Sequence, residues 1–321
     1  MKKIFLIIIT FTISVIYYND LFSLTTSETN PTKYSELWGY LMKGEEVFLR
    51  SEMPVTDIGY FSAGINSFGN FQNNLTKNDI KNFRGKVHLV VAELGNHSLT
   101  HFLLNPKYEL RDQLISDIYL ASENFDGVQI DFEKVLSKDG DNFLEFLTLL
   151  KKQLKGKCLS VAVPARKRFI KDAYDYERLG VIADRIIIMA YDEHWSTSEP
   201  GPIASYDWCR DVMNYALIKI DKEKIVMGIP FYGRSWVNKK YNRAYKFIDT
   251  EKILNNINPE INYTVDGMPF FIYDSSVTVT YYFENAKTIR SKLQLYQGSS
   301  INKVAFWRIS QEDPDVWNIF N

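Results

Sequence analysis

The chain is 321 residues long, with 45% hydrophobic and 15% aromatic residues, so it can bury the core of one large domain. Its 38 basic and 39 acidic residues nearly cancel. Because of this balance, and because no basic stripe runs along the sequence, we exclude a nucleic-acid-binding protein. The aromatic residues fit either a carbohydrate-binding cleft or the core itself.

The first 24 residues predict an export segment. Two lysines follow Met1, and an apolar run then extends from Ile4 to Tyr18, which is the pattern of a secretory signal. The run is shorter than the ~18 residues of a spanning helix, and no small-x-small cleavage site follows it, so a cleaved signal and a retained anchor both stay open. Residues 25–33 are polar and predict a linker to a domain over 34–321. We therefore expect an exported protein of the periplasm, cell envelope or extracellular space.

Eight short apolar runs then alternate with longer segments of helical spacing. The runs are Leu37–Met42, Asp57–Ser62, Val87–Glu93, Gly127–Phe132, Leu159–Pro164, Arg185–Ala190, Ile225–Pro230 and Lys303–Trp307. Most are almost continuously apolar, as expected for parallel strands buried on both faces. Helical spacing is clearest in Leu110–Glu123, Phe143–Leu154 and Asp207–Ile220. The alternation predicts an α/β protein with a (β/α)8 TIM barrel, although a doubly wound open sheet would give a similar pattern.

One interval is too long for a simple crossover. Residues 238–280, between the seventh and eighth runs, mix tyrosine, asparagine and β-branched residues, and we expect them to form a small inserted lobe beside the barrel. A last helix over Phe283–Leu295 would follow the lobe. The two cysteines, Cys158 and Cys209, lie far apart and are best interpreted as free thiols, with a single disulfide as the alternative. Among the four histidines only His97 and His101 are four residues apart. A pair alone does not make a metal site, so we expect neither a metal nor another cofactor.

The fourth run carries the residues that predict chemistry. Side chains alternate between the two faces of a strand, so Gln129, Asp131 and Glu133 would point into the barrel. Polar groups at the carboxyl end of a barrel strand lie where such enzymes place their active sites. Two carboxylates about 7 Å apart at their Cα atoms repel each other unless one holds a proton, which is how a general acid stays protonated near neutral pH. Strand-end residues that merely form hydrogen bonds are the alternative.

The segment Asp126–Glu133 resembles the D-G-x-D-x-D-x-E signature of glycoside hydrolase family 18, the chitinase family, with Gln129 in place of the usual aspartate. Ile188–Asp192 resembles the family's M-x-Y-D strand end, and Val304–Trp307 resembles its last strand. The family's S-x-G-G on the third strand is not recognisable in Val90–Gly95. More narrowly, the chain is similar to the bacterial cell-wall and spore-cortex N-acetylglucosaminidases. The segments that carry this similarity are Met189–Trp195, Gly201–Cys209, Gly228–Trp236 and Ala305–Trp317.

The resemblance implies a retaining, substrate-assisted mechanism. Glu133 would protonate the glycosidic oxygen, and the acetamido carbonyl of the sugar would act as the nucleophile. Asp131 would accept a hydrogen bond from the acetamide N–H, Tyr191 would donate one to the acetamide oxygen, and Trp307 would stack under the sugar. Asp192 would contact the sugar or brace its own loop.

Further candidate residues are weaker. Arg234 is a candidate for substrate binding, but a salt bridge is the default interpretation for both Arg234 and Arg308. His194 and Trp195 are candidates for substrate contact from a loop. Gln129 could donate an amide hydrogen bond to Asp131, which would favour the charged carboxylate and lower its pKa.

Two other classes of protein stay open. A catalytically silent, lectin-like sugar-binding barrel would lack the acid, whereas Glu133 is present. An aldolase-like barrel would need a Schiff-base lysine or a phosphate site, and no glycine-rich phosphate loop follows the last strands. We therefore expect a monomeric glycosidase that acts on peptidoglycan or a chitin-like polymer of N-acetylglucosamine.

Overall fold

A computed structural model of the chain describes residues 33–81, 83–238, 241–274 and 276–320. The predicted export segment, residues 1–24, and residues 25–32 of the predicted linker lie outside the described residues. No helix within the described ranges is long and apolar enough to cross a membrane.

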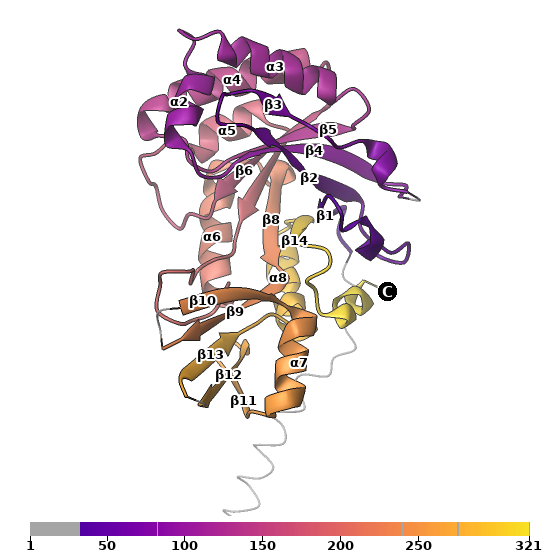
Figure 1. The fold of residues 1–321 in the computed structure, drawn as a ribbon, viewed down its shortest axis with the longest axis vertical. Coiled ribbons are helices and arrows are strands. Elements are labelled where there is room, and N and C mark those ends of the chain that lie inside the picture. The colour runs from indigo at the N-terminus through magenta and orange to yellow at the C-terminus, as the bar shows by residue number, and fades with distance from the viewer. Residues whose placement is uncertain (1–32, 82, 239–240, 275, 321) are drawn as a thin grey trace, which may run out of the picture.

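Eight parallel strands form a closed barrel, and Figure 1 shows the helices that lie around it. The strands are β1 (Glu36–Met42), β2 (Asp57–Ile65), β4 (Lys86–Glu93), β5 (Gly127–Phe132), β6 (Cys158–Pro164), β7 (Arg185–Met189), β8 (Ile225–Pro230) and β14 (Lys303–Trp307). The ring closes because β1 pairs in parallel with both β14 and β2. The closure confirms the predicted barrel and excludes the open sheet.

Helices cover the outside of the barrel over most of its circumference. They are α2 (His97–Leu104), α3 (Leu110–Ala121), α4 (Gly140–Gln153), α5 (Tyr176–Ile182), α6 (Tyr206–Lys219) and α8 (Ala286–Gly298). In α4 the predicted stripe from Phe143 to Leu154 is buried. Asp141 in its first turn and Lys151 in its last complement the helix dipole. Helix α8 begins three residues later than predicted, because the Asn285 side chain accepts a hydrogen bond from the Thr288 N–H and caps the helix there.

The first two crossovers differ from the predicted alternation. The described residues between β1 and β2 and between β2 and β4 form no α-helix. They form only the short 3-10 helices Glu46–Phe48 and Lys77–Asp79 and the short strand β3 (Phe71–Gln72). The second crossover contains Asn66, Gly69 and a run of further asparagines, which favour turns over helix. One side of the barrel is therefore covered by loops.

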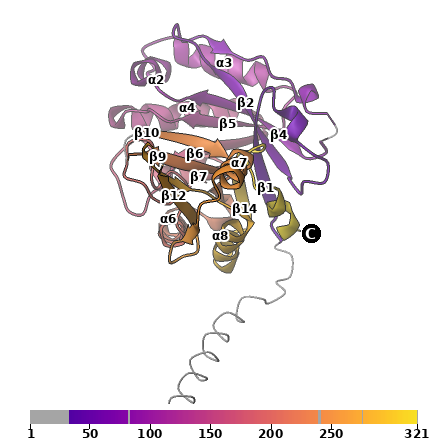
Figure 2. The same cartoon turned by 60° about the horizontal axis from the view of Figure 1, so that its bottom comes forward.

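An inserted lobe lies between β8 and β14 (Figure 2). Its antiparallel sheet contains β9 (Tyr232–Val237), β10 (Tyr241–Lys246), β11 (Ile261–Tyr263), β12 (Pro269–Asp274) and β13 (Thr278–Tyr282), in the order β10-β9-β13-β12-β11. Helix α7 (Phe247–Ile257) follows β10. The lobe has its own core around Phe271 and Tyr281. It begins at Tyr232, six residues before the predicted boundary at 238, because β9 follows β8 after the single residue Phe231.

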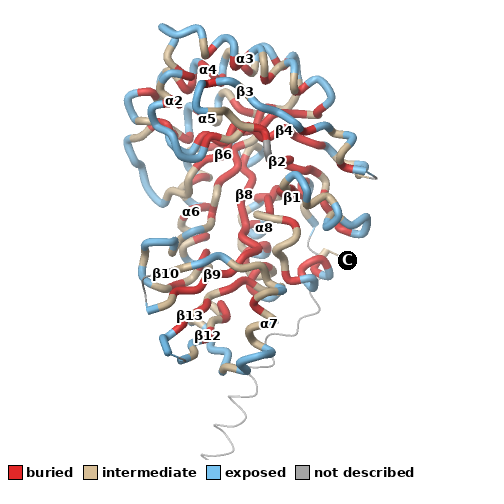
Figure 3. The backbone as a smooth tube through the Cα atoms, in the orientation of Figure 1, coloured by how far each residue is buried: buried red, intermediate tan, exposed pale blue. Residues whose placement is uncertain are grey.

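The barrel strands are buried over most of their length (Figure 3). Their side chains separate into an outer and an inner core. On β5, Val128, Ile130 and Phe132 pack in the large cluster between barrel and helices, as the alternation of the sequence predicts. A smaller cluster fills the barrel interior, and it includes Trp38 and Val90.

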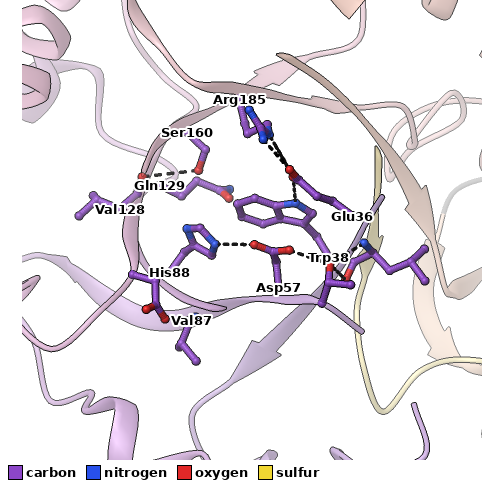
Figure 4. A network of polar contacts seen from close by, with 12 residues as sticks. Glu36, Trp38, Asp57, Val87, His88, Val128, Gln129, Ser160 and Arg185 are labelled. Carbon is purple, nitrogen blue, oxygen red and sulfur yellow. Dashed lines mark hydrogen bonds and ion pairs between the residues drawn. The ribbon is translucent and has the colours of Figure 1, made fainter. Parts of the chain in front are cut away.

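Near the amino ends of the strands the barrel interior is charged (Figure 4). The Arg185 guanidinium binds the Glu36 carboxylate, with Nε and Oε2 3.0 Å apart, and the Trp38 indole N–H donates to the same carboxylate at 2.9 Å. Alongside, His88 Nε2 lies 2.9 Å from Asp57 Oδ1. Each buried charge thus has a partner of opposite sign or a polar neighbour, as burial requires.

Candidate active site

The carboxyl ends of the barrel strands and the lobe enclose a pocket. Its lining residues are Phe61, Leu94, Asp131, Glu133, Met189, Tyr191, Asp192, Tyr232, Arg234, Ala244, Trp307 and Gln311. They come from five barrel strands or their ends and from the lobe strands β9 and β10. The structure therefore brings together six of the seven residues that the sequence predicted for the site, and the seventh, Gln129, lies deeper in the barrel.

Strand β5 positions the two carboxylates. Asp131 pairs with Ala92 of β4, and the Glu133 N–H donates to the Glu93 carbonyl at 2.9 Å, so the ladder continues to the strand end. The Asp131 side chain faces inward and the residue is 4% exposed, whereas Glu133 stands at the exposed mouth of the pocket. One strand thus presents a buried and an accessible carboxylate two residues apart.

Asp131 is a buried acid without compensation. Its Oδ1 is buried and has no hydrogen-bond partner among the described residues. Burial, and then the nearby Glu133 charge, raise its pKa from 3.8 to about 7. A substrate group that donates a hydrogen bond would find an acceptor ready at this oxygen.

Glu133 has the electrostatics of a general acid. Burial raises its pKa, the adjacent Lys134 lowers it, and the Asp192 charge raises it again, with a net increase. A raised pKa keeps a carboxyl protonated closer to neutral pH, where it can donate its proton.

Gln129 does not act on Asp131 as expected. Its Oε1 accepts a hydrogen bond of 2.9 Å from the Tyr40 hydroxyl on β1. The predicted lowering of the Asp131 pKa is therefore wrong, because burial raises that pKa and no Gln129 hydrogen bond opposes the effect. Gln129 is 1% exposed and lies one layer below the pocket floor, so it is not placed to contact a substrate.

Two aromatic residues form walls of the pocket. Tyr191 follows β7 and packs edge-to-face on Tyr232, with ring centroids 6.3 Å apart. Its ring lies against β8 at Gly228, where a Cβ atom would be 2.7 Å from the Ile188 carbonyl oxygen and 3.0 Å from the Tyr191 ring. Burial raises the pKa of the Tyr191 hydroxyl well above its usual value, so it remains a hydrogen-bond donor. At the end of β14, Trp307 packs edge-to-face on Phe61 at 5.0 Å.

Asp192 joins the barrel to the lobe. Its Oδ1 accepts hydrogen bonds from the Tyr232 hydroxyl at 2.6 Å and from Arg234 Nη2 at 2.8 Å. Its backbone has φ of +58°, a left-handed conformation that aspartate and asparagine tolerate best among residues with a side chain beyond Cβ. Arg234 thus forms the salt bridge that was its default interpretation, and it also lines the pocket.

Several other candidates lie outside the pocket lining. His194 Nδ1 contacts the Pro202 carbonyl at 2.8 Å, and the exposed Trp195 donates to Thr197. Arg308 forms its expected ion pair, with Glu45. Asp126, the first residue of the sequence signature, precedes β5 at the opposite end of the barrel, where it binds Lys77 and the Val87 N–H, each at 2.7 Å.

The sequence did not predict Tyr232, Phe61 or Gln311 as site residues. Phe61 was visible as an aromatic residue near the end of the second predicted strand. Tyr232 and Gln311 had no such signal, because the pocket wall they form depends on how the lobe folds back.

The described residues contain no group of three or more His, Cys, Asp or Glu side chains arranged to hold a metal ion. Cys158 and Cys209 are both free, and burial raises the pKa of each thiol to about 12. Both thiols are therefore poor nucleophiles at neutral pH.

Comparison with known proteins agrees with this geometry. Residues 26–312 match the model of the glycosyl hydrolases family 18. The uncharacterized glycosylase YvbX of Bacillus subtilis is 27% identical over 74% of this chain and 72% of its own. The cortical fragment-lytic enzyme of Bacillus anthracis is 26% identical over 71% of this chain, which spans only 57% of that enzyme's length. The chain spans 54% of the length of another relative, a sporulation-specific glycosylase of Bacillus subtilis.

Solved structures have the same fold. The spore cortex-lytic enzyme SleL of Bacillus cereus superimposes with a TM-score of 0.82 at 23% identity, over 92% of this chain and 75% of that one. A chitinase from Chromobacterium violaceum superimposes with a TM-score of 0.79 at 25% identity, over 89% and 97% of the two chains.

A (β/α)8 barrel whose strand ends present a buried and an accessible carboxylate among aromatic walls is an arrangement that glycosidases use. The match over nearly the whole described chain shows the family: the protein belongs to the glycosyl hydrolases family 18.

Proposed function

We propose that the protein hydrolyses β-linked N-acetylglucosamine glycans, with peptidoglycan as the natural polymer, by retaining, substrate-assisted catalysis. The observation that carries this proposal is the state of Asp131. A buried carboxylate with an unpartnered oxygen, two residues from an accessible acid, suits a mechanism in which the protein supplies no nucleophile of its own.

The proposed roles follow from the placement of the side chains. Glu133 protonates the glycosidic oxygen, while the carbonyl oxygen of the sugar's acetamido group attacks the anomeric carbon and forms a cyclic oxazolinium. Tyr191 donates to that carbonyl oxygen and Trp307 supports the sugar ring. Glu133, now a carboxylate, removes a proton from water as the water opens the oxazolinium, so the configuration is retained.

Asp131 has a pKa near neutrality in the free protein, and the substrate would change that balance. The acetamide N–H would give Oδ1 the hydrogen bond that it lacks, which favours the charged form. The negative charge then opposes the positive charge of the oxazolinium in a buried site, where electrostatic stabilisation is strong.

Peptidoglycan is favoured over chitin by the relatives. They include a cortical fragment-lytic enzyme and a glycosylase, both from Bacillus, although chitinases have the same fold. A wall polymer as substrate agrees with the export segment that the sequence predicts. We propose that the exported protein acts as a monomer.

The test is the replacement Glu133→Gln, which keeps the shape of the side chain and removes its proton. We expect turnover of a chromogenic N-acetylglucosaminide and of purified peptidoglycan to fall by about 10²–10⁴-fold, with binding retained. Glu123→Gln, on the far side of the barrel, is the matched control and should behave as the parent. Equal turnover of Glu133→Gln and the parent would remove Glu133 from the mechanism. A parent protein that binds the glycan without cleaving it would instead be a lectin-like barrel.

A further inference from the structure

Two loops beside the active-site pocket carry a concentrated positive charge. Residues 134–138 follow β5, and residues 165–171 follow β6. Together they contain six basic residues and no acidic one. Five of the six are exposed and form no ion pair with another described residue: Lys134, Lys138, Lys167, Arg168 and Lys171. We call these two loops the basic rim.

The two loops form one surface. The Tyr174 hydroxyl donates to the Phe132 carbonyl at 2.5 Å and accepts from the Val135 N–H at 3.2 Å, so it grips the backbone on both sides of Glu133. The Asp172 carboxylate in turn accepts from the Tyr174 N–H at 2.9 Å and pairs with Arg166. The loop after β6 is therefore fixed to the segment that carries the acid.

The basic rim also exposes apolar side chains. Phe169 is 66% exposed and Ile170 is 46% exposed, and they stand between Arg168 and Lys171. Most neighbouring acidic residues are occupied: Asp175 caps α5, Asp141 binds Arg178, and Asp139 binds His101. Glu133 faces the rim only at its edge, beside Lys134. An acidic partner with small apolar groups would thus meet unopposed positive charge and uncovered hydrophobic surface.

We propose that the basic rim binds the acidic peptide that branches from the glycan strand of peptidoglycan. This inference rests on the proposed function and deepens it, because it explains how the site distinguishes peptidoglycan from chitin. Chitin is neutral along its whole length and offers the rim nothing to bind. A branch peptide carries carboxylates and methyl groups and leaves the glycan sideways, toward loops that flank the cleft. A membrane surface fits less well, since a bilayer on these loops would cover the pocket.

The experiment compares three substrates: a soluble peptide-bearing glycan, the same glycan stripped of its peptides by an amidase, and a neutral chitooligosaccharide. The variant combines Lys167→Gln, Arg168→Gln and Lys171→Gln. We expect the ratio of kcat/KM on peptide-bearing glycan to kcat/KM on chitooligosaccharide to fall about threefold to tenfold, mainly through KM, because exposed charge pairs are individually weak. The ratio of stripped glycan to chitooligosaccharide should not change.

The matched control removes three exposed cations at the other end of the barrel, in Arg84→Gln, Lys152→Gln and Lys222→Gln. It should keep the parent's ratios. The unmodified protein gives an independent measurement, because added salt screens exposed charges over about 10 Å at 0.1 M. Raising the salt concentration should lower the parent's ratio to that of the rim variant.

Each other outcome has a distinct meaning. If the rim variant and the parent share the same ratio while both cleave their substrates, the inference is overturned and the proposed function stands. The amidase leaves a free carboxylate on each sugar that carried a peptide. If the variant loses activity on stripped glycan as well, the rim binds that sugar carboxylate and the peptide assignment is wrong. Binding of the parent to anionic lipid vesicles, lost in the variant without any change in the ratios, would identify a membrane surface instead. If no substrate is cleaved and Glu133→Gln equals the parent, the proposed function fails and this inference with it.

Discussion

At the scale of one residue, Asp131 shows that a group in the candidate site can lower the stability of the folded protein. A carboxylate buried to 4% exposure without a partner at Oδ1 disfavours its charged form, and the neighbouring Glu133 adds repulsion. Because the pKa is raised to about 7 in the native state only, the stability of the protein depends on pH. Between roughly pH 4 and pH 7 the native state holds a proton that the unfolded chain has released, so stability falls as pH rises through this window.

We predict that Asp131→Asn stabilises the protein at pH 8 while activity is lost. A neutral amide cannot be forced to ionise, so the free energy of unfolding should rise by about 2–4 kcal/mol at pH 8. Below about pH 4, Asp131 is protonated in both the native and the unfolded state of the parent, so the gain in stability should vanish. Urea unfolding at pH 4 and pH 8 measures both.

Asp126, just before the same strand, is the matched control. Burial raises its pKa, but the hydrogen bonds from Lys77 and the Val87 N–H outweigh burial and lower it. Asp126→Asn should therefore destabilise the protein at pH 8. The same sign of effect for the two substitutions would contradict the assigned electrostatics.

The sequence predicted which side chains face the barrel interior, but it did not predict their partners. Alternation along β5 is local, so Asp131 and Glu133 could be assigned to one face from eight residues of sequence. The partner of Gln129 is Tyr40, which is 89 residues away. Contacts of this kind depend on the registers of several strands, and no local pattern encodes them.

At the scale of elements, the end of β7 is coupled to both β5 and β9. Asp192 follows β7, receives hydrogen bonds from Tyr232 and Arg234 on β9, and raises the pKa of Glu133 beyond β5. The Asp192 carboxylate therefore interacts with residues of three elements that are far apart in the sequence.

We predict that Asp192→Asn moves the alkaline limb of the kcat/KM profile to lower pH. The protonated form of Glu133 is the active acid, so kcat/KM falls as pH rises through its pKa. Removing the Asp192 charge lowers that pKa and brings the fall forward. Asparagine tolerates the left-handed backbone at this position, so the loop should keep its shape. Kinetics with a soluble substrate between pH 4 and pH 9 measure the limb.

Tyr232→Phe is the control for this prediction. It removes a hydrogen bond from the Asp192 carboxylate and leaves the charge in place. Its alkaline limb should stay with the parent's. A shift equal to that of Asp192→Asn would show that the position of the loop, and not the Asp192 charge, determines the pKa of Glu133.

The elements themselves were predicted where their pattern is local. All eight barrel strands were found, because buried parallel strands are short apolar runs. The two missing helices and the early start of the lobe were not predicted. Asparagines in the second crossover and the single connecting residue Phe231 account for two of these features, and periodicity has no signal there.

At the scale of the whole molecule the two ends of the barrel have opposite characters. At the carboxyl ends Asp131 is buried and uncompensated. At the amino ends Glu36 is buried against Arg185 and Trp38. Burial raises the pKa of Glu36, but these hydrogen bonds and the Arg185 charge outweigh burial and lower it. The paired charges at the amino ends stabilise the barrel, whereas the uncompensated carboxyl group at the other end destabilises it and belongs to the candidate site.

We predict that Arg185→Gln destabilises the protein by about 3 kcal/mol at pH 7, because it leaves Glu36 buried without its counter-charge. A carboxyl with a depressed pKa stabilises the native state above its unfolded pKa and loses that contribution as pH falls. The gap between variant and parent should therefore shrink near pH 3. Thermal unfolding at the two pH values measures it.

Arg178→Gln removes an exposed ion pair with Asp141 and serves as the control. We expect a change below about 1 kcal/mol at either pH. An Arg185→Gln variant no less stable than this control would show that the charges inside the barrel do not hold it together.

The single-residue connection between β8 and β9 has a consequence for how a polymer enters the protein. Phe231 is buried, its ring stacks on Phe306 at 4.6 Å, and its N–H donates to the Trp307 carbonyl at 2.7 Å. The lobe is further tied to the last loop by the hydrogen bond from the Phe247 N–H to the Gln311 carbonyl at 2.9 Å. We expect a wall fastened in this way to stay in place rather than to open and close like the lids of many enzymes. For the proposed function, we therefore expect a glycan to enter and leave the pocket without movement of the lobe.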